Sequence, residues 1–120
     1  MPVHGQLDYA EYPARDLDAT RRFFAEAFGL EFTDYGPDYI AFARAGAGLD
    51  GGFYRADLAA RTDRGSALLV FYSARLEQTQ AKVEAAGGTV VKPVFDFPGG
   101  RRFHFIDPSG NELAVWQTAS

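Results

Sequence analysis

The chain has 120 residues, of which 47% are hydrophobic and 15% aromatic, enough to form one domain with its own core. Sixteen acidic residues against twelve basic ones give a net charge of −4, so a nucleic-acid-binding surface has no electrostatic basis. Because the chain has no cysteine, disulfides, zinc-thiolate sites and thiol nucleophiles are excluded. The N-terminal residues lack a secretory pattern and no apolar run reaches the length of a membrane span, so we expect a cytoplasmic protein.

The first half of the chain predicts one strand, one helix and three further strands. Alternation of side chains over residues 7–13 predicts the first strand. A helix follows, because Asp16 can cap its N-terminus, apolar side chains recur at helical spacing, and Gly29 can end it in a left-handed conformation. The glycine pair Gly51 and Gly52 indicates a bulge or the close approach of another backbone. The three further strands are predicted at residues 32–35, 39–43 and 50–55.

The second half repeats this order after a polar connection over residues 56–65. An apolar run over residues 67–72 predicts a strand, Ser73 can cap a second helix, and Gly87 can end it. The helix-ending glycines Gly29 and Gly87 lie 58 residues apart, so we interpret the chain as two copies of one unit. The last three strands are predicted at residues 89–94, 101–106 and 112–116.

Two segments carry a resemblance to a known family: YPARDLDATRRFFAEAFGLEF, which enters the first helix, and FIDPSGNEL, which precedes the last strand. With the tandem strand-helix-strand-strand-strand units, they resemble the vicinal oxygen chelate superfamily, which includes lactoylglutathione lyases, bleomycin resistance proteins and extradiol dioxygenases. The resemblance implies an α+β fold of two tandem βαβββ units, whose curved half-barrel sheets carry the helices on their convex face. We expect one glyoxalase-like domain over residues 1–120, with units at about 5–56 and 66–117. Paired half-barrels, within one chain or across a homodimer, would enclose a ligand cavity.

The same resemblance implies where metal-dependent members would hold their ion. The ligand of the first strand corresponds to Tyr9, and its equivalent in the repeat corresponds to Ala67. The glutamate of the last strand corresponds to Ala114, and the fourth position falls near Gly52 or Phe53. None of these side chains is the imidazole or carboxylate that a divalent metal requires. We therefore expect no cofactor, and a metal site built from other residues is the alternative.

Strand parity predicts which side chains face the cavity. If Tyr9 and Ala114 face it, the same face carries Glu11, Leu69, Phe71, Arg102, His104, Glu112 and Trp116. The opposite face is apolar enough to pack beneath the helices and consists of Ala10, Tyr12, Phe103, Phe105, Leu113 and Val115. The predicted cavity is aromatic with a few ionisable groups, which is typical of pockets for small organic molecules.

Glu11 and His104 are the candidates for acid–base catalysis in this cavity. The alternatives are a salt bridge from Glu11 to Arg101 or Arg102, and a satisfied core or rim position for His104. The arginine pair would hold an anion or remain solvated. The candidate ligand-binding residues are Tyr9, Phe71, Arg102, Glu112 and Trp116. Two of these, Tyr9 and Trp116, would stack on a flat ligand or fill the cavity themselves.

These residues favour a small-molecule binding protein of the glyoxalase and bleomycin-resistance type, independent of metal, that holds an aromatic or amphipathic ligand. The alternative is an enzyme, a lyase, isomerase or dioxygenase-like protein, that uses Glu11 and His104 or an unrecognised divalent metal site. The turn at Asp107-Pro108-Ser109-Gly110 has a complete structural explanation and is not expected to take part in chemistry. The expected partners are a small organic molecule and a second copy of the chain, with no nucleic acid and no membrane.

Overall fold

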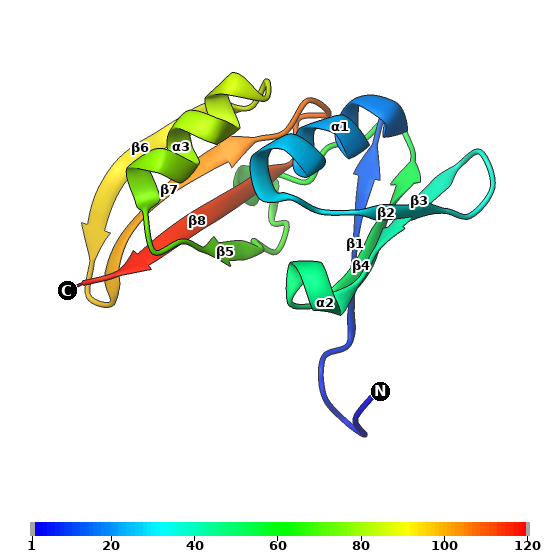
Figure 1. Ribbon diagram of the computed structural model, residues 1–120, viewed down its shortest axis with the longest axis horizontal. Helices are drawn as coiled ribbons and strands as arrows, with labels where there is room; N and C mark the ends of the chain where they lie inside the picture. The colour runs from blue at the N-terminus through cyan, green and yellow to red at the C-terminus, as the bar shows by residue number, and fades with distance from the viewer. Residues whose placement is uncertain (1, 120) are drawn as a thin grey trace.

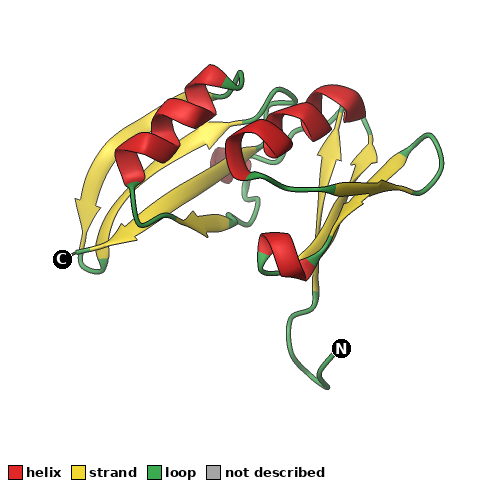
Figure 2. Ribbon diagram, in the orientation of Figure 1, coloured by secondary structure: helices red, strands yellow, loops and turns green. Residues whose placement is uncertain are grey.

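The computed structural model describes residues 2–119 as two four-stranded sheets with helices α1 and α3 on the same side (Figures 1 and 2). The first half consists of β1 (Tyr9–Ala14), α1 (Leu17–Phe28), β2 (Phe32–Asp34), β3 (Tyr39–Phe42), α2 (Arg44–Ala47) and β4 (Asp50–Arg55). The second half consists of the short helix η1 (Thr62–Arg64), β5 (Val70–Tyr72), α3 (Leu76–Ala85), β6 (Thr89–Phe97), β7 (Gly100–Ile106) and β8 (Glu112–Thr118).

The two sheets have the same topology, which confirms the predicted fold class. The strand orders are β1-β4-β3-β2 and β5-β8-β7-β6, and in each sheet the first strand pairs parallel to the last. Both sheets are open and neither closes into a barrel. Among residues 2–119, every helix is too short or too polar to form a bilayer-spanning segment.

The first helix begins and ends where its sequence predicts. The Asp16 carboxylate accepts a hydrogen bond from the Ala19 amide at 3.1 Å, and Gly29 ends the helix with a φ of 70°. The apolar side of the helix buries Phe23 and Phe24 against the sheets, where Phe23 contacts Phe105 with ring centroids 5.8 Å apart. Full burial of one such ring contributes about 1.5–3 kcal/mol, so this aromatic stripe is a main source of stability.

The predicted assignment of side chains to the two faces of the sheet is confirmed for β7 and β8. Phe103, Phe105, Leu113 and Val115 are buried in the core beneath the helices, as predicted. Cross-strand pairing places His104 opposite Ala114 and Arg102 opposite Trp116, so these side chains share the other face of the sheet. The helix-free face of the second sheet therefore carries the residues of β7 and β8 that the sequence predicts on the cavity side.

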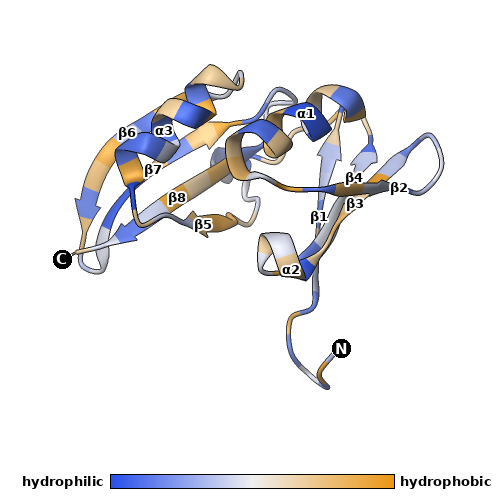
Figure 3. Ribbon diagram, in the orientation of Figure 1, coloured by the Kyte–Doolittle hydropathy of each residue, from blue (hydrophilic) through white to orange (hydrophobic). Residues whose placement is uncertain are grey.

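The predicted parity of β5 is wrong. Val70 pairs with Ala114 and Phe71 with Val115, so Phe71 lies on the helix side, where its ring stacks on Phe28 with centroids 3.9 Å apart. Leu69 packs against the same core. The strand is apolar along its whole length (Figure 3), so its sequence carries no alternation from which its faces could be assigned.

The close approach indicated by Gly51 and Gly52 lies within their own sheet. A Cβ atom at Gly51 would meet the Ala10 carbonyl oxygen of β1 and the ring of Phe42, and one at Gly52 would meet the ring of Tyr39. The register of β4 with both neighbouring strands is continuous there, so no bulge forms. A second chain is not needed to explain this glycine pair.

The turn between β7 and β8 joins the two halves of the molecule. The Asp107 carboxylate accepts hydrogen bonds from the Ser109 and Asn111 amides, both at 2.9 Å, and its burial raises the pKa of Asp107 to about 6 against these bonds. The Asn111 side chain donates to the Pro13 carbonyl at 2.6 Å and accepts from the Ala60 amide at 2.8 Å. The motif that marks the family resemblance therefore links the two halves through hydrogen bonds. We call the side chains of Asp107 and Asn111 the clasp.

Candidate functional site

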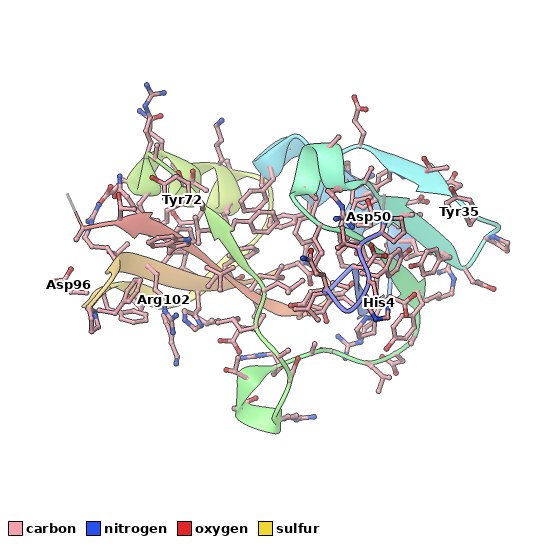
Figure 4. All side chains as sticks on the ribbon, turned by 90° about the horizontal axis from the view of Figure 1, so that it is seen from below. His4, Tyr35, Asp50, Tyr72, Asp96 and Arg102 are labelled. Carbon is pink, nitrogen blue, oxygen red and sulfur yellow. The ribbon has the colours of Figure 1, made fainter. Side chains whose placement is uncertain are left out.

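The helix-free faces of the two sheets carry most of the predicted site residues. Figure 4 views the molecule from below, with Tyr72 and Arg102 on the strands of the second sheet and Asp50 at the start of β4 in the first.

A buried carboxylate–imidazole pair lies at one end of the helix-free face of the second sheet. His104 Nδ1 is 2.8 Å from Glu112 Oε2, and the two residues are only 2% and 4% exposed. The amide and the hydroxyl of Thr62 donate to the other carboxylate oxygen of Glu112, at 2.9 Å and 2.7 Å. Burial alone would raise the pKa of Glu112, but these hydrogen bonds outweigh it and lower that pKa to about 2. The ionised carboxylate accepts from Nδ1, which leaves Nε2 as the second functional atom of the ring.

Two aromatic rings flank the side chain of Arg102 further along the same face, and two more continue the aromatic surface beside them. The guanidinium carbon of Arg102 lies 5.3 Å from the ring centroid of Phe95 and 5.4 Å from that of Phe97. Trp116, opposite Arg102 on β8, contacts Phe97 at 6.2 Å and Tyr72 at 5.2 Å between ring centroids. We call Tyr72, Phe95, Phe97 and Trp116 the aromatic shelf. Among residues 2–119, Arg102 makes no ion pair with a carboxylate.

The helix-free face of the first sheet holds Tyr9 and Glu11. The hydroxyls of Tyr9 and Tyr39 are 2.6 Å apart, and the Tyr39 hydroxyl donates to Glu11 Oε2 at 2.9 Å. Burial, together with the hydrogen bonds to Tyr9 and Glu11, raises the pKa of Tyr39. The side chain of Glu11 thus bonds to a tyrosine, and the alternative of a salt bridge to Arg101 or Arg102 is wrong.

The structure does not bring together the predicted catalytic pair. Glu11 lies on β1 of the first sheet and His104 on β7 of the second, and each has a different hydrogen-bond partner. The carboxylate beside His104 is Glu112. Strand alternation already predicts that His104 and Glu112 lie on the same face. Because the turn sets Ala114 opposite His104, Glu112 is the diagonal neighbour of His104, and this register could have predicted the pair.

The two neighbouring arginines point to opposite faces of β7. Arg101 donates to both carboxylate oxygens of Glu77, at 2.7 Å and 3.0 Å, and to the Gln117 side chain at 2.8 Å. Only Arg102 lies on the helix-free face, so the two side chains do not grip one anion together.

A separate apolar cleft of about 470 Å³ opens between the halves on the helix side. Phe28 and Phe42 of the first half and Phe71 and Leu113 of the second line it, next to α2. Of the predicted ligand-binding residues, Phe71 belongs to this cleft and Arg102, Glu112 and Trp116 to the second sheet. Tyr9 lies on the first sheet.

The donor set does not fit a divalent metal. Ala114 is fully buried beside His104 and offers no ligand atom, and the side chain of Ala67 offers none. Over residues 2–119, no three side chains of His, Asp or Glu come together in a group that could hold an ion.

Comparison with known proteins agrees with this fold. The family model of the glyoxalase/bleomycin resistance protein/dioxygenase superfamily matches residues 6–115. The chain belongs to this superfamily. Among solved structures, a glyoxalase-related enzyme from Fulvimarina pelagi is 22% identical, with 95% of this chain and 88% of that one covered and a TM-score of 0.75.

Two further structures show the same superfamily fold. A family enzyme from Burkholderia phytofirmans PsJN is 16% identical over 95% of this chain and 99% of that one, with a TM-score of 0.77. TnmS3, an antibiotic binding protein from Streptomyces sp. CB03234, is 20% identical over 98% and 99%, with a TM-score of 0.69. A search of proteins with curated functions found no match. At these identities the likeness concerns the fold.

Proposed function

We propose that this glyoxalase-superfamily protein binds a small aromatic or amphipathic molecule on the helix-free face of the second sheet, without a metal. The observation that carries the proposal is the aromatic shelf around Arg102, whose charge has no carboxylate partner in residues 2–119. Binding sites for small molecules combine aromatic walls with a few placed polar groups, and this surface has both. TnmS3 offers supporting context as an antibiotic binding protein with this fold.

The only tryptophan of the chain, Trp116, lies in the shelf and makes the proposal testable. We expect 2-naphthoate to bind chelator-treated protein in isothermal titration calorimetry. Trp116→Leu should weaken binding roughly fivefold, because one aromatic contact contributes about 0.5–1.5 kcal/mol beyond its buried area. Tyr35→Leu, which removes an exposed ring from the turn between β2 and β3, is the matched control and should leave the dissociation constant unchanged. Equal binding by the wild type and Trp116→Leu would contradict the proposed site.

Independence from metal is tested by titrating the same protein with Ni²⁺, Zn²⁺, Fe²⁺ and Mn²⁺. We expect no stoichiometric binding and no change in the affinity for 2-naphthoate, because the side chains at the positions of the family's ligands are Tyr9, Ala67 and Ala114. Tight binding of one ion per chain would contradict this part of the proposal.

The Glu112–His104 pair favours a second candidate function, an enzyme that abstracts a proton beside a carbonyl group. The ionised carboxylate of Glu112 orients the imidazole through Nδ1, so Nε2 is the ring nitrogen placed to act as a general base. Phenylpyruvate, a flat aromatic keto acid, is a suitable probe. Deuterium incorporation at its C3 position above the buffer rate, lost in His104→Gln, would establish this activity; no acceleration by the wild type would exclude it for this probe.

The proposal includes a homodimer, because each half presents an open face. Tyr9 and Tyr54, 48% and 36% exposed, lie on the helix-free face of the first sheet, where a second copy could cover them. Sedimentation equilibrium should give twice the chain mass of 13.1 kDa at micromolar concentration. A single species at the chain mass would count against the dimer and leave the ligand site to be tested separately.

A further inference from the structure

We infer that the ligand of the second sheet is anionic, with a carboxylate or similar group bound by Arg102 and Arg61 beside the aromatic shelf. This inference rests on the proposed function and specifies the chemical class of the ligand. Its starting point is the distribution of buried polar side-chain atoms that lack a partner. Within residues 2–119 there are three such atoms, Arg61 Nε, Arg102 Nε and His104 Nε2, and all belong to this one region of the molecule.

The contacts of Glu112 connect these nitrogens. Arg61 Nε lies 3.9 Å from Glu112 Oε1, which is too far for a hydrogen bond, and His104 holds the other carboxylate oxygen. Arg102 lies two residues before His104 on the same face of β7, at a strand spacing of about 7 Å. The same ring of Phe95 contacts both side chains, with its centroid 5.8 Å from that of His104.

The charge of this region is positive, although the chain as a whole carries −4. Arginine side chains such as Arg61 and Arg102 are cationic at any physiological pH. Within residues 2–119, Glu112 is the one carboxylate in an ion pair with Arg61 or His104. Lys92, exposed on β6 and paired across from His104, adds a further positive charge. In an acidic molecule, a cationic region beside apolar walls attracts anions and discriminates against cations.

The chemistry of the guanidinium group decides between an anionic and a neutral ligand. Phe95 and Phe97 contact Arg102 through their π faces, and the buried Nε of its guanidinium has no hydrogen-bond acceptor among residues 2–119. A buried donor without an acceptor is unfavourable, and a planar anion can accept two N–H bonds from one guanidinium. An aromatic acid would thus place its ring on the shelf and its anionic group on the arginines.

Three naphthalene probes of matched shape test this inference: the anion 2-naphthoate, the neutral 2-naphthamide and the cation 2-naphthylmethylammonium. Calorimetry at pH 7 and low salt should give a dissociation constant at least roughly tenfold lower for the anion than for the neutral probe, and no measurable binding of the cation. In Arg102→Met, 2-naphthoate should bind as weakly as 2-naphthamide, whose own affinity should change by less than roughly twofold. Arg101→Met, the neighbouring residue on the other face, is the matched control and should retain the preference.

The outcomes separate the inference from the proposed function. Equal affinities for the three probes, or a preference that persists in Arg102→Met, would overturn the anionic ligand while the binding function stands. Failure of all three probes to bind would count against the binding function and the inference with it. If circular dichroism shows that Arg102→Met does not fold, Arg61→Met takes its place, with an expected loss of roughly threefold or more for 2-naphthoate alone; an unchanged preference there would equally overturn the inference.

Discussion

The two helix-free faces share one strand topology and differ in how their polar groups are satisfied. On the first sheet, Tyr9, Tyr39 and Glu11 hydrogen-bond to one another. On the second, Arg102 and His104 retain nitrogens without partners. Because buried polar groups in folded proteins are normally paired, an unpaired set on one face marks the place where something else supplies the bonds. The two copies of one backbone unit thus differ: one face satisfies its polar groups within its own sheet, and the other, to which we propose that a ligand binds, keeps unpaired nitrogens.

The central strands explain how the two faces came to differ in shape. In β4, Gly51 and Gly52 lack side chains, so the rings of Phe42 and Tyr39 lie close against the strand, one on each face. In β8, Ala114 and Trp116 occupy successive positions of the helix-free face, and the ring of Trp116 forms part of the aromatic shelf. The ring of Tyr39 therefore lies over the glycine position of the first face, whereas the ring of Trp116 projects from the matching strand of the second.

The largest effect is expected where the two halves are joined. Asn111→Ala removes the partners of the Pro13 carbonyl and the Ala60 amide, and each buried group left unsatisfied costs about 1–3 kcal/mol. Urea unfolding should show a loss of about 2–5 kcal/mol in a single transition. Ser66→Ala, whose hydroxyl bonds only to the next carbonyl, is the control and should lie near wild type. A loss as small as that of the control would mean that the halves are stable without the clasp.

The buried glutamate of the second helix-free face, Glu112, should contribute to acid stability. The pKa of Glu112 is lowered from 4.5 to about 2, so its ionisation stabilises the fold fully above pH 4.5, and this contribution is lost as the pH falls through 2. At 1.36 kcal/mol per pKa unit, the contribution is about 3 kcal/mol. Unfolding free energies measured from pH 7 to pH 2 should fall less steeply in Glu112→Gln than in wild type. Equal curves for the wild type and Glu112→Gln would show that Glu112 carries no such linkage.

The sequence predicts the fold well because its strongest signals are local. The cap at Asp16 and the left-handed Gly29 set the bounds of α1, and alternation in β7 and β8 sets their faces. Where both faces of a strand are buried or apolar, as at Phe71, the register is decided by the neighbouring strand, and the sequence offers no alternation to read. The short helix α2 was also missed, since glycines at positions 46 and 48 favour a loop.

The candidate site is predictable in part for the same reason. Arg102, His104, Glu112 and Trp116 lie on one face because a hairpin fixes their order. Thr62 and Arg61 come from the connection between the halves, where no periodic pattern foretells that a loop folds back onto Glu112. The pairing of Tyr39 with Glu11 depends likewise on the packing of β3 over Gly52.

Filling the glycine position of the first face should cost less than removing the clasp. Gly52→Ala would place a methyl group against the Tyr39 ring and the Ile40 carbonyl, and such overpacking costs about 1–3 kcal/mol. Thermal unfolding followed by circular dichroism should detect this loss. Gly46→Ala, in α2 with open space around it, is the matched control and should be neutral or stabilising by up to about 1 kcal/mol. If both variants behaved alike, the close packing of the first face would not be a constraint.

The smallest effect is expected from the hydroxyl of Tyr39. Tyr39→Phe removes its bonds to Tyr9 and Glu11 at a partly exposed site, where a hydrogen bond contributes about 0.5–1.5 kcal/mol. Because burial and these bonds raise the pKa of Tyr39, an alkaline absorbance titration should show one fewer late-titrating tyrosine in the variant. The affinity for 2-naphthoate should not change, since the first face satisfies its own polar groups. A larger loss of affinity in Tyr39→Phe than in Trp116→Leu would reverse the comparison and assign the ligand to the first sheet.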